Sequence, residues 1–203
     1  MIVLGLDTTG PDCSVSLVDE ASVLAHMSKN IGRGHAEVLA GMVEKAFALA
    51  GLKPDAIDRI AVCTGPGSFT GLRVALSFAI GFALPRNLPV IGIDALGLTH
   101  MKNEPTGSPY TVPYKDIRRQ EVMFGTYSGP CPLFAYHPKT GSIEEAKDEA
   151  KLLQLDLIEV KSIDTRILAW LAINLNPADY PPEPLYSRGP DAKLPGGASP
   201  RKA

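Results

Sequence analysis

The sequence contains few residues that could form cross-links or bind metal. Its three cysteines, Cys13, Cys63 and Cys131, are far apart and form no C-x-x-C pair. They predict buried, reduced thiols rather than a disulfide framework or a zinc site. No two of the four histidines lie four residues apart, the helical spacing of a metal-binding pair. We therefore expect no metal site.

Long apolar runs and a strong charge imbalance are also missing. The most apolar run, residues 74–84, is too short to cross a bilayer and ends at Pro85. The N-terminus starts directly with a strand pattern instead of a signal peptide. A net charge of -2 and a pI near 6.1 exclude a strong general attraction to RNA or anionic lipid. We expect a cytoplasmic protein that has no membrane contact and reaches any RNA through a partner.

The 203 residues, 45% apolar and 21% charged, are typical of a soluble protein with one large or two small domains. Turn residues concentrate in 103–109, which predicts two lobes, 1–102 and 103–203. The tail from residue 176 is rich in proline and glycine. Such a tail can dock or stay mobile, but it cannot build a core.

The most informative stretch runs from Cys63 to Arg73, where a strand-like run reaches a glycine-rich turn and then a helix. Gly65 and Gly67 permit a tight turn, and Ser68 or Thr70 can cap the helix. Such a turn can direct backbone N–H groups at a phosphate or carboxylate, or it can simply join strand to helix. Its spacing fits neither the Rossmann fingerprint nor the lysine-containing phosphate loop.

A second polar turn, Asp7-Thr8-Thr9, follows the predicted first strand at residues 2–6. This layout resembles the first phosphate loop of the actin-like ATPases, in which the carboxylate holds a hydrated metal. The glycine usually found two residues after the aspartate is missing, and an aspartate that merely ends a strand fits equally well. The candidate phosphate loop comprises Asp7, Thr8, Thr9, Gly65, Gly67, Ser68, Thr70 and Arg73.

The helix after the glycine loop has two apolar faces. One face consists of Leu72, Ala75, Leu76, Ala79 and Ala83, and the other of Val74, Phe78 and Phe82. Two apolar faces need two surfaces to cover them. One is the protein's own sheet, and for the other we predict a helix of a second subunit, approached closely at Gly71, Ala75 and Gly81. The alternative is a helix at the centre of a single core.

An amphipathic pattern over residues 35–50 predicts a second helix in the same interface. His35, at its start, has no second histidine four residues on, so we expect no metal ligand there. The predicted partner interface comprises His35, Leu39, Met42, Val43, Ala46, Phe47, Leu72, Ala75, Leu76, Ala79 and Phe82.

Taken together, these segments resemble the TsaB family, also called YeaZ, which takes part in making threonylcarbamoyladenosine in tRNA. The matching segments are residues 4–9, 13–17, 35–39, 65–73, 116–122 and 184–193. The glycine-rich segment 65–73 is the most specific of them, and residues 131–176 match least.

The resemblance implies an α/β protein with the actin-like ATPase fold, also called RNase H-like, in which two lobes of mixed sheet carry crossing helices and the second lobe is reduced. It implies a non-catalytic subunit that dimerises with its paralogue TsaD through two N-terminal helices. TsaD transfers the threonylcarbamoyl group to N6 of adenine at position 37 of ANN-decoding tRNAs. TsaE, an ATPase, joins the pair, and tRNA is contacted through the complex. A self-complementary apolar face would also allow a homodimer with no other partner, held by the same two helices, and we expect a homodimer when TsaD is absent.

No catalytic residue and no cofactor are predicted for this chain, although ATP or ADP can sit at the subunit junction of such a complex. The second-lobe nucleotide loop of actin-like enzymes is expected near residues 157–162, where the sequence has no glycine. The alternative hypothesis is an autonomous enzyme of the same fold, either a small-molecule kinase or ATPase or a glycoprotease. A kinase needs both phosphate loops, and a protease needs a metal pair or an activated nucleophile.

Overall fold

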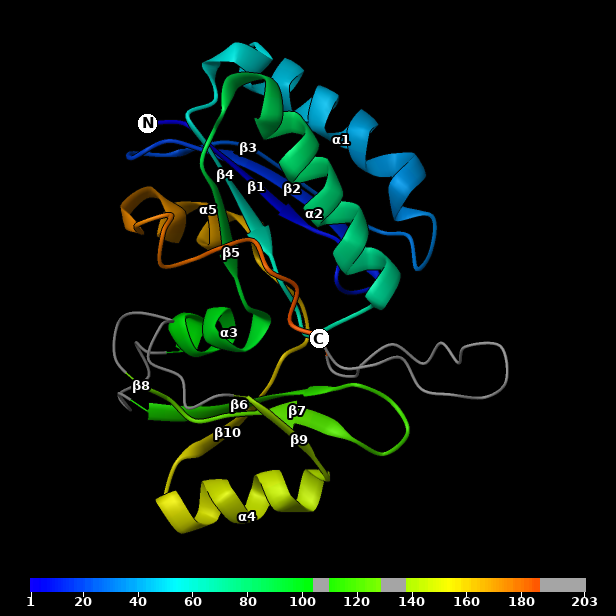
Figure 1. Cartoon of the computed structure of the whole chain (residues 1–203), viewed down its shortest axis with the longest axis vertical. Helices are drawn as coiled ribbons and strands as arrows, with labels where there is room; N and C mark the ends of the chain where they lie inside the picture. The colour runs from blue at the N-terminus through cyan, green and yellow to red at the C-terminus, as the bar shows by residue number, and fades with distance from the viewer. Residues whose placement is uncertain (104–109, 129–137, 187–203) are drawn as a thin grey trace, which may run out of the picture.

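The computed structural model describes residues 1–103, 110–128 and 138–186, which form two α/β lobes stacked along the long axis of the molecule (Figure 1). The first lobe contains a five-stranded sheet in the order β3-β2-β1-β4-β5. Its strands are β1 (Val3–Asp7), β2 (Asp12–Val18), β3 (Val23–Asn30), β4 (Arg59–Cys63) and β5 (Val90–Ile93). The first three strands form the expected antiparallel meander, and β4 and β5 lie parallel to β1.

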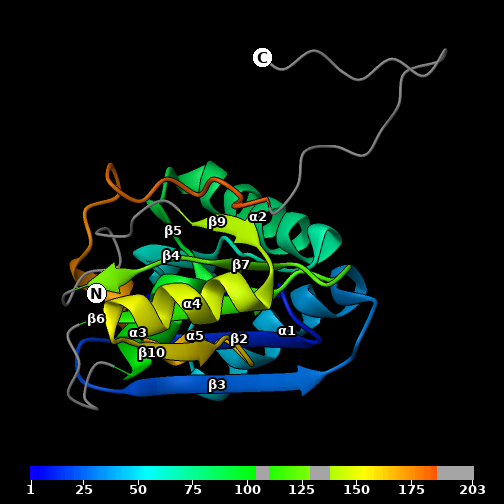
Figure 2. The ribbon, with the colours of Figure 1, turned by 90° about the horizontal axis from the view of Figure 1, so that it is seen from below.

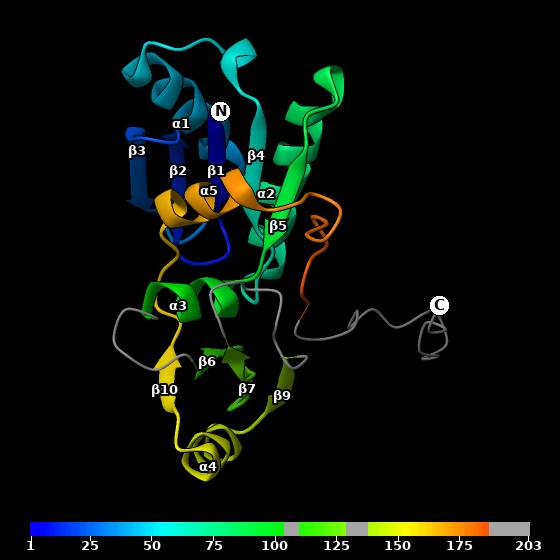
Figure 3. The same cartoon turned by 90° about the vertical axis from the view of Figure 1, so that its left-hand side faces the viewer.

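Helices cover both faces of this sheet. Helix α1 (His35–Ala50) and helix α2 (Phe69–Ala83) pack on one face, and α5 (Thr165–Asn174) packs on the other (Figure 3). Short 3-10 turns, Pro54–Ala56 and Leu84–Arg86, follow α1 and α2. The apolar side chains of β1, β2 and β4 alternate between the two layers, because successive residues of a strand point to opposite faces.

The second lobe is smaller. Its sheet has the order β10-β6-β7-β9, with β8 also paired to β6. The strands are β6 (Tyr110–Asp116), β7 (Val122–Phe124), β8 (Tyr127–Ser128), β9 (Lys139–Gly141) and β10 (Asp156–Glu159). Helix α3 (Ala95–Asn103) lies between the two sheets, and α4 (Ile143–Leu153) covers the outer face, nearest the viewer in Figure 2. A capping box between Ser142 and Glu145 starts α4.

The two sheets repeat one topology. In each, three antiparallel strands in chain order are followed by a helix and a strand parallel to the first, giving β3-β2-β1-β4 and β9-β7-β6-β10. The first sheet adds a second helix and a fifth strand, whereas the described part of the second sheet lacks this unit. This duplicated pattern is the actin-like fold with a reduced second lobe, so the predicted fold class is confirmed.

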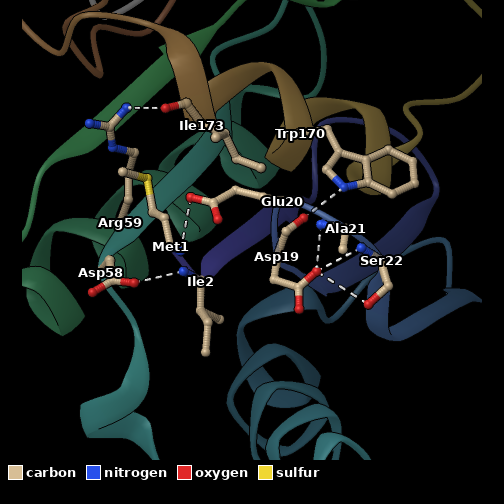
Figure 4. Close-up of polar contacts among 10 residues, drawn as sticks. All are labelled: Met1, Ile2, Asp19, Glu20, Ala21, Ser22, Asp58, Arg59, Trp170 and Ile173. Atoms are coloured by element: carbon tan, nitrogen blue, oxygen red, sulfur yellow. Dashed lines mark hydrogen bonds and ion pairs between the residues drawn. The ribbon is translucent and has the colours of Figure 1, made fainter.

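The chain crosses back to the first lobe near its C-terminal end. Helix α5 packs against β1, β2 and β4, although the sequence analysis assigned all residues after 102 to the second lobe. Figure 4 shows two of the contacts that hold it: Arg59 Nη1 donates to the carbonyl oxygen of Ile173 at 3.3 Å, and Trp170 Nε1 donates to the carbonyl oxygen of Asp19 at 3.0 Å. Residues 165–174 therefore belong with the first sheet, which corrects that assignment; the division at residue 102 otherwise stays a prediction.

The buried thiols of Cys13 and Cys63 form no disulfide, and burial raises the pKa of the Cys13 thiol to about 11. Cys131 lies outside the described residues. No helix in the described part of the chain has the length and apolar character needed to cross a membrane.

The contact between α5 and the sheet gives a direct test of the packing. A Cβ atom added at Gly5 would lie 2.5 Å from the carbonyl oxygen of Thr165 and 3.0 Å from Cβ of Ala169. We expect Gly5→Ala to lower the free energy of unfolding by about 1–3 kcal/mol, because α5 must move away from β1. Urea denaturation measures the change. The matched control is Gly10→Ala, where an added Cβ meets no atom within 4 Å; equal stability of the two variants would contradict the packing.

Candidate functional site

The two turns predicted to form a phosphate loop lie side by side. Thr8 Oγ1 donates a hydrogen bond to the carbonyl oxygen of Gly71 at 2.6 Å, and the backbone N–H of Ser68 donates to the carbonyl oxygen of Thr9 at 2.7 Å. The Ser68 hydroxyl accepts from the Gly71 N–H and caps α2. The turns therefore bind each other. The Ser68 N–H group, a backbone donor that such a turn could offer to an anion, is already hydrogen-bonded to Thr9.

Glycine is needed where the turns meet. A Cβ atom at Gly67 would lie 2.4 Å from the Thr9 carbonyl oxygen, and one at Gly71 would overlap the Thr8 carbonyl oxygen. These two glycines serve close approach within the chain. This corrects the expectation that Gly71 admits a partner helix, because its open side faces the first hairpin turn.

Asp7 lies at the base of this junction and is 2% exposed. Its Oδ1 atom accepts hydrogen bonds from the backbone N–H of Thr9 at 3.0 Å and from Thr9 Oγ1 at 2.7 Å. Burial raises the pKa of the Asp7 carboxyl group, while these hydrogen bonds and the positive charge of Lys115 act in the opposite direction. Groups of this chain thus offset part of the cost of burying the charged carboxylate, but the pKa stays raised.

The cleft between the lobes, where an actin-like ATPase would hold its nucleotide, is almost filled. A cavity of about 10 Å³ remains, room for roughly one water molecule. Lys115 Nζ donates to the carbonyl oxygen of Val160 at 2.7 Å on the second-lobe side. The lining residues are Asp7, Thr9, Gly10, Pro11, Asp12, Pro66, Lys115, Val160, Lys161, Ser162 and Ile163. The glycine-free segment expected to form the second-lobe loop does reach the cleft, and its side chains help to fill it.

An open groove lies instead between α1 and α2. This groove has a volume of about 540 Å³ and is mainly apolar. Its lining residues are Ala36, Leu39, Phe69, Thr70, Arg73, Val74, Ser77 and Phe78. Thr70 and Arg73 were predicted to belong to the phosphate loop, but they are exposed here, whereas the other six candidates lie at the junction of the turns.

The structure corrects most of the predicted partner interface. Ten of its eleven residues are at most 8% exposed, and eight of these ten, all except His35 and Leu72, belong to the core between α1, α2 and the first sheet. Leu39 reaches the surface only as part of the groove lining, and Phe82 is half-buried. The stripe that includes Ala75 and Ala79 faces the sheet, so substitutions there would disturb folding rather than test association.

The outward face of α2 is the second apolar face recognised in the sequence. Val74, Phe78 and Phe82 are half-buried. Ile80, which is 47% exposed, lies on another side of α2, because it follows Phe78 by two residues, about 200° around the helix. The Phe78 and Phe82 rings stack with their centroids 6.0 Å apart. The sequence pattern had separated the two faces correctly, but it could not show which of them meets the sheet.

Two hydroxyl–imidazole pairs were not foreseen. Ser16 Oγ lies 2.9 Å from His26 Nδ1, because the two residues face each other across β2 and β3, and Thr111 Oγ1 lies 2.8 Å from His100 Nδ1. Both hydroxyl groups are at most 1% exposed, so neither has access to a substrate. The described residues also include no cluster of three His, Cys, Asp or Glu side chains suited to a metal ion.

The fold and the filled cleft define a class, that of actin-like proteins with two α/β lobes. Within it, residues 23–131 match the family described as TsaD: tRNA N6-adenosine threonylcarbamoyltransferase. The chain belongs to this family, and it is similar to the TsaB (YeaZ) proteins that the sequence resembles.

Three comparisons illustrate this relationship. The chain is 32% identical over 207 residues to an uncharacterised protein of Mycobacterium tuberculosis, covering 94% of this chain and 93% of that one. It is 36% identical over 129 residues to the tRNA threonylcarbamoyladenosine biosynthesis protein TsaB of Escherichia coli, covering 63% and 55%. The solved structure of YeaZ from Pseudomonas aeruginosa matches with a TM-score of 0.71 at 23% identity, covering 91% and 99%. The last match shows a shared fold.

The buried Asp7 carboxyl group gives a pH-dependent prediction. Its pKa is raised in the folded state above the unfolded value of about 3.9, so the folded state binds the proton more tightly. Its contribution to stability therefore decreases as the pH rises from about 4 through the folded pKa. We expect Asp7→Asn to melt close to the wild type near pH 4 and at a higher temperature at neutral pH. Asp55→Asn, at an exposed carboxylate, is the control, and a lower melting temperature of Asp7→Asn at neutral pH would contradict this prediction.

Proposed function

We propose that this chain is a non-catalytic activator and scaffold subunit of the complex that makes N6-threonylcarbamoyladenosine at position 37 of ANN-decoding tRNAs. In this proposal it dimerises with the catalytic paralogue TsaD, and the ATPase TsaE joins the pair. It meets tRNA through the complex and works in the cytoplasm. The observation that carries the proposal is the apolar outer face of α1 and α2 in a member of this family whose nucleotide cleft is filled.

The filled cleft supports a role without catalysis. A cavity of about 10 Å³ is far below the several hundred cubic ångströms of an ordinary ligand pocket. The Asp7 carboxylate is occupied by Thr9, and the Ser68 N–H by the first hairpin turn. Nucleotide binding at a subunit junction stays possible in this proposal, because such a site would use surfaces of both chains.

The names of relatives support the pathway. The Escherichia coli and Haemophilus influenzae proteins that match over more than half of this chain are named for the biosynthesis of tRNA threonylcarbamoyladenosine. The family that matches residues 23–131 is that of the transferase itself, so a transferase partner would have related α1 and α2 helices. Two related chains can then pair through the same two helices in a pseudo-symmetric interface.

The same face also serves a homodimer. An apolar face that is self-complementary can bind a second copy of this chain as well as its paralogue. We propose that the homodimer forms in the absence of TsaD and gives way to the heterodimer in its presence. Nothing in this arrangement requires a separate surface for each partner.

The proposed face is tested by a charge placed on it. Ser77→Glu changes an exposed residue of α2 that lines the groove, so we expect normal folding and loss of association with TsaD of at least tenfold, because the carboxylate would be desolvated in the interface. Leu152→Glu, on the 82% exposed Leu152 side chain of α4, is the matched control. Thermal melting reports folding, and sedimentation velocity with purified TsaD reports association.

Reconstitution tests the activity itself. We expect the purified chain to release no phosphate from ATP and to leave tRNA unmodified, and its mixture with TsaD, TsaE and threonylcarbamoyl-adenylate or its precursors to modify tRNA. Omission of this chain should abolish or strongly reduce modification. An inactive complete mixture would remove the proposed function, and phosphate release that Asp7→Ala abolishes would instead support an autonomous ATPase or kinase.

A further inference from the structure

Residues 176–186, called here the C-terminal strap, run back along the edge of the first sheet. The Gly92 N–H donates to the carbonyl oxygen of Tyr180 at 3.0 Å, and the Leu185 N–H donates to the carbonyl oxygen of Thr64 at 2.8 Å. The Tyr180 side chain is 6% exposed and lies in the core beneath α5. Figure 3 shows the strap beside β5. The sequence left open whether the proline-rich tail docks on the protein or stays mobile, and residues 176–186 of the tail dock.

Two glycines make room for the strap. A Cβ atom at Gly92 would lie 2.5 Å from the carbonyl oxygen of Pro181, and one at Gly65 would lie 3.3 Å from that of Leu185. The strap therefore contacts the edge strand and the glycine loop at backbone distance. Its position is fixed by the same loop that starts α2.

The strap ends at the mouth of the α1–α2 groove. The Tyr186 ring packs against the Phe69 ring, with centroids 5.2 Å apart. Arg73 Nε donates to the Tyr186 hydroxyl at 3.3 Å, and the Arg73 guanidinium lies 3.9 Å from the Phe69 ring centroid. Phe69 and Arg73 both line the groove. Among the described residues, none accepts a hydrogen bond from the terminal nitrogens of Arg73.

We propose that Tyr186 is a positioning residue that holds Arg73 at the groove, where the guanidinium binds a carboxylate of the TsaD-type partner. This inference rests on the proposed function, since it needs a partner in the groove. Helix α2 contains no acidic residue, and Arg73 forms no ion pair with any carboxylate of the described residues, Glu37 and Glu44 of α1 included, so its charge is left for a carboxylate of the partner. A guanidinium already ordered by two aromatic rings loses less entropy on binding than a free one. The C-terminal strap thus becomes part of the interaction surface.

A double-mutant cycle with Tyr186→Ala, Arg73→Met and the combined variant tests this role in the full-length chain. We expect each single variant to bind TsaD about tenfold more weakly and the double variant to be little weaker than Arg73→Met alone, because Tyr186 acts through Arg73. Tyr186→Phe, which keeps the ring and removes the hydroxyl acceptor, should lose about threefold. Affinity should fall with added salt in the wild type and much less in Arg73→Met. Leu152→Ala, at an exposed site on α4, is the control.

Each outcome decides between the two proposals. If Tyr186→Ala binds TsaD as tightly as the wild type does, the inference is overturned and the proposed function stays intact. Additive losses of affinity in the double-mutant cycle would have the same meaning. Failure of the wild type to bind TsaD would overturn both. If Tyr186→Ala lowers the melting temperature as well, hydrogen exchange of residues 69–73 separates the causes: faster exchange confined to this turn supports the inference, and faster exchange throughout the first lobe contradicts it.

Discussion

The contact between the first hairpin turn and the glycine loop is the constraint on which the rest of the structure depends. Thr8 and Thr9 bind the backbone of the loop at Gly71 and Ser68, and Gly67 and Gly71 permit this approach. Because α2 starts in this loop, the contact fixes the rotation of α2 relative to the sheet. It therefore decides which apolar stripe is buried and which is presented outward. The same hydrogen bonds use the Ser68 N–H group that an anion would otherwise bind.

Two properties of the molecule follow from this one contact. On one side, the turn carrying Asp7 and the second-lobe residues around Val160 fill the interlobe cleft. On the other side, α1 and α2 leave an apolar groove in contact with solvent. The small interlobe cavity and the open apolar groove are the two features on which the proposed function rests. The C-terminal strap joins the two sides, since it contacts the glycine loop and ends beside the groove.

Much of the fold was predictable from local patterns. Such patterns reflect interactions within a few residues. Examples are the alternation of small polar and apolar residues in β2, the helical spacing from Leu39 to Phe47 and the capping serines at 68 and 142. The candidate site was predicted less well. Helical periodicity separated Ala75 and Ala79 from Val74 and Phe78, but both sets are apolar, so composition could not show which set the sheet would cover. The predicted interface consequently took in mostly core residues.

The sequence by itself determined the first strand, the helix over residues 35–50, the helix that follows the glycine loop and the family, because each is carried by short segments whose patterns can be interpreted alone. Only the tertiary structure decided that α5 returns to the first sheet, that the phosphate-like turns bind each other and that Tyr186 reaches Arg73. These contacts join residues that are far apart in the chain, as the Thr8–Gly71 and Ser16–Thr165 hydrogen bonds illustrate, with separations of 63 and 149 positions. Their physical basis is shape and hydrogen-bond complementarity between distant segments, which local propensity does not record.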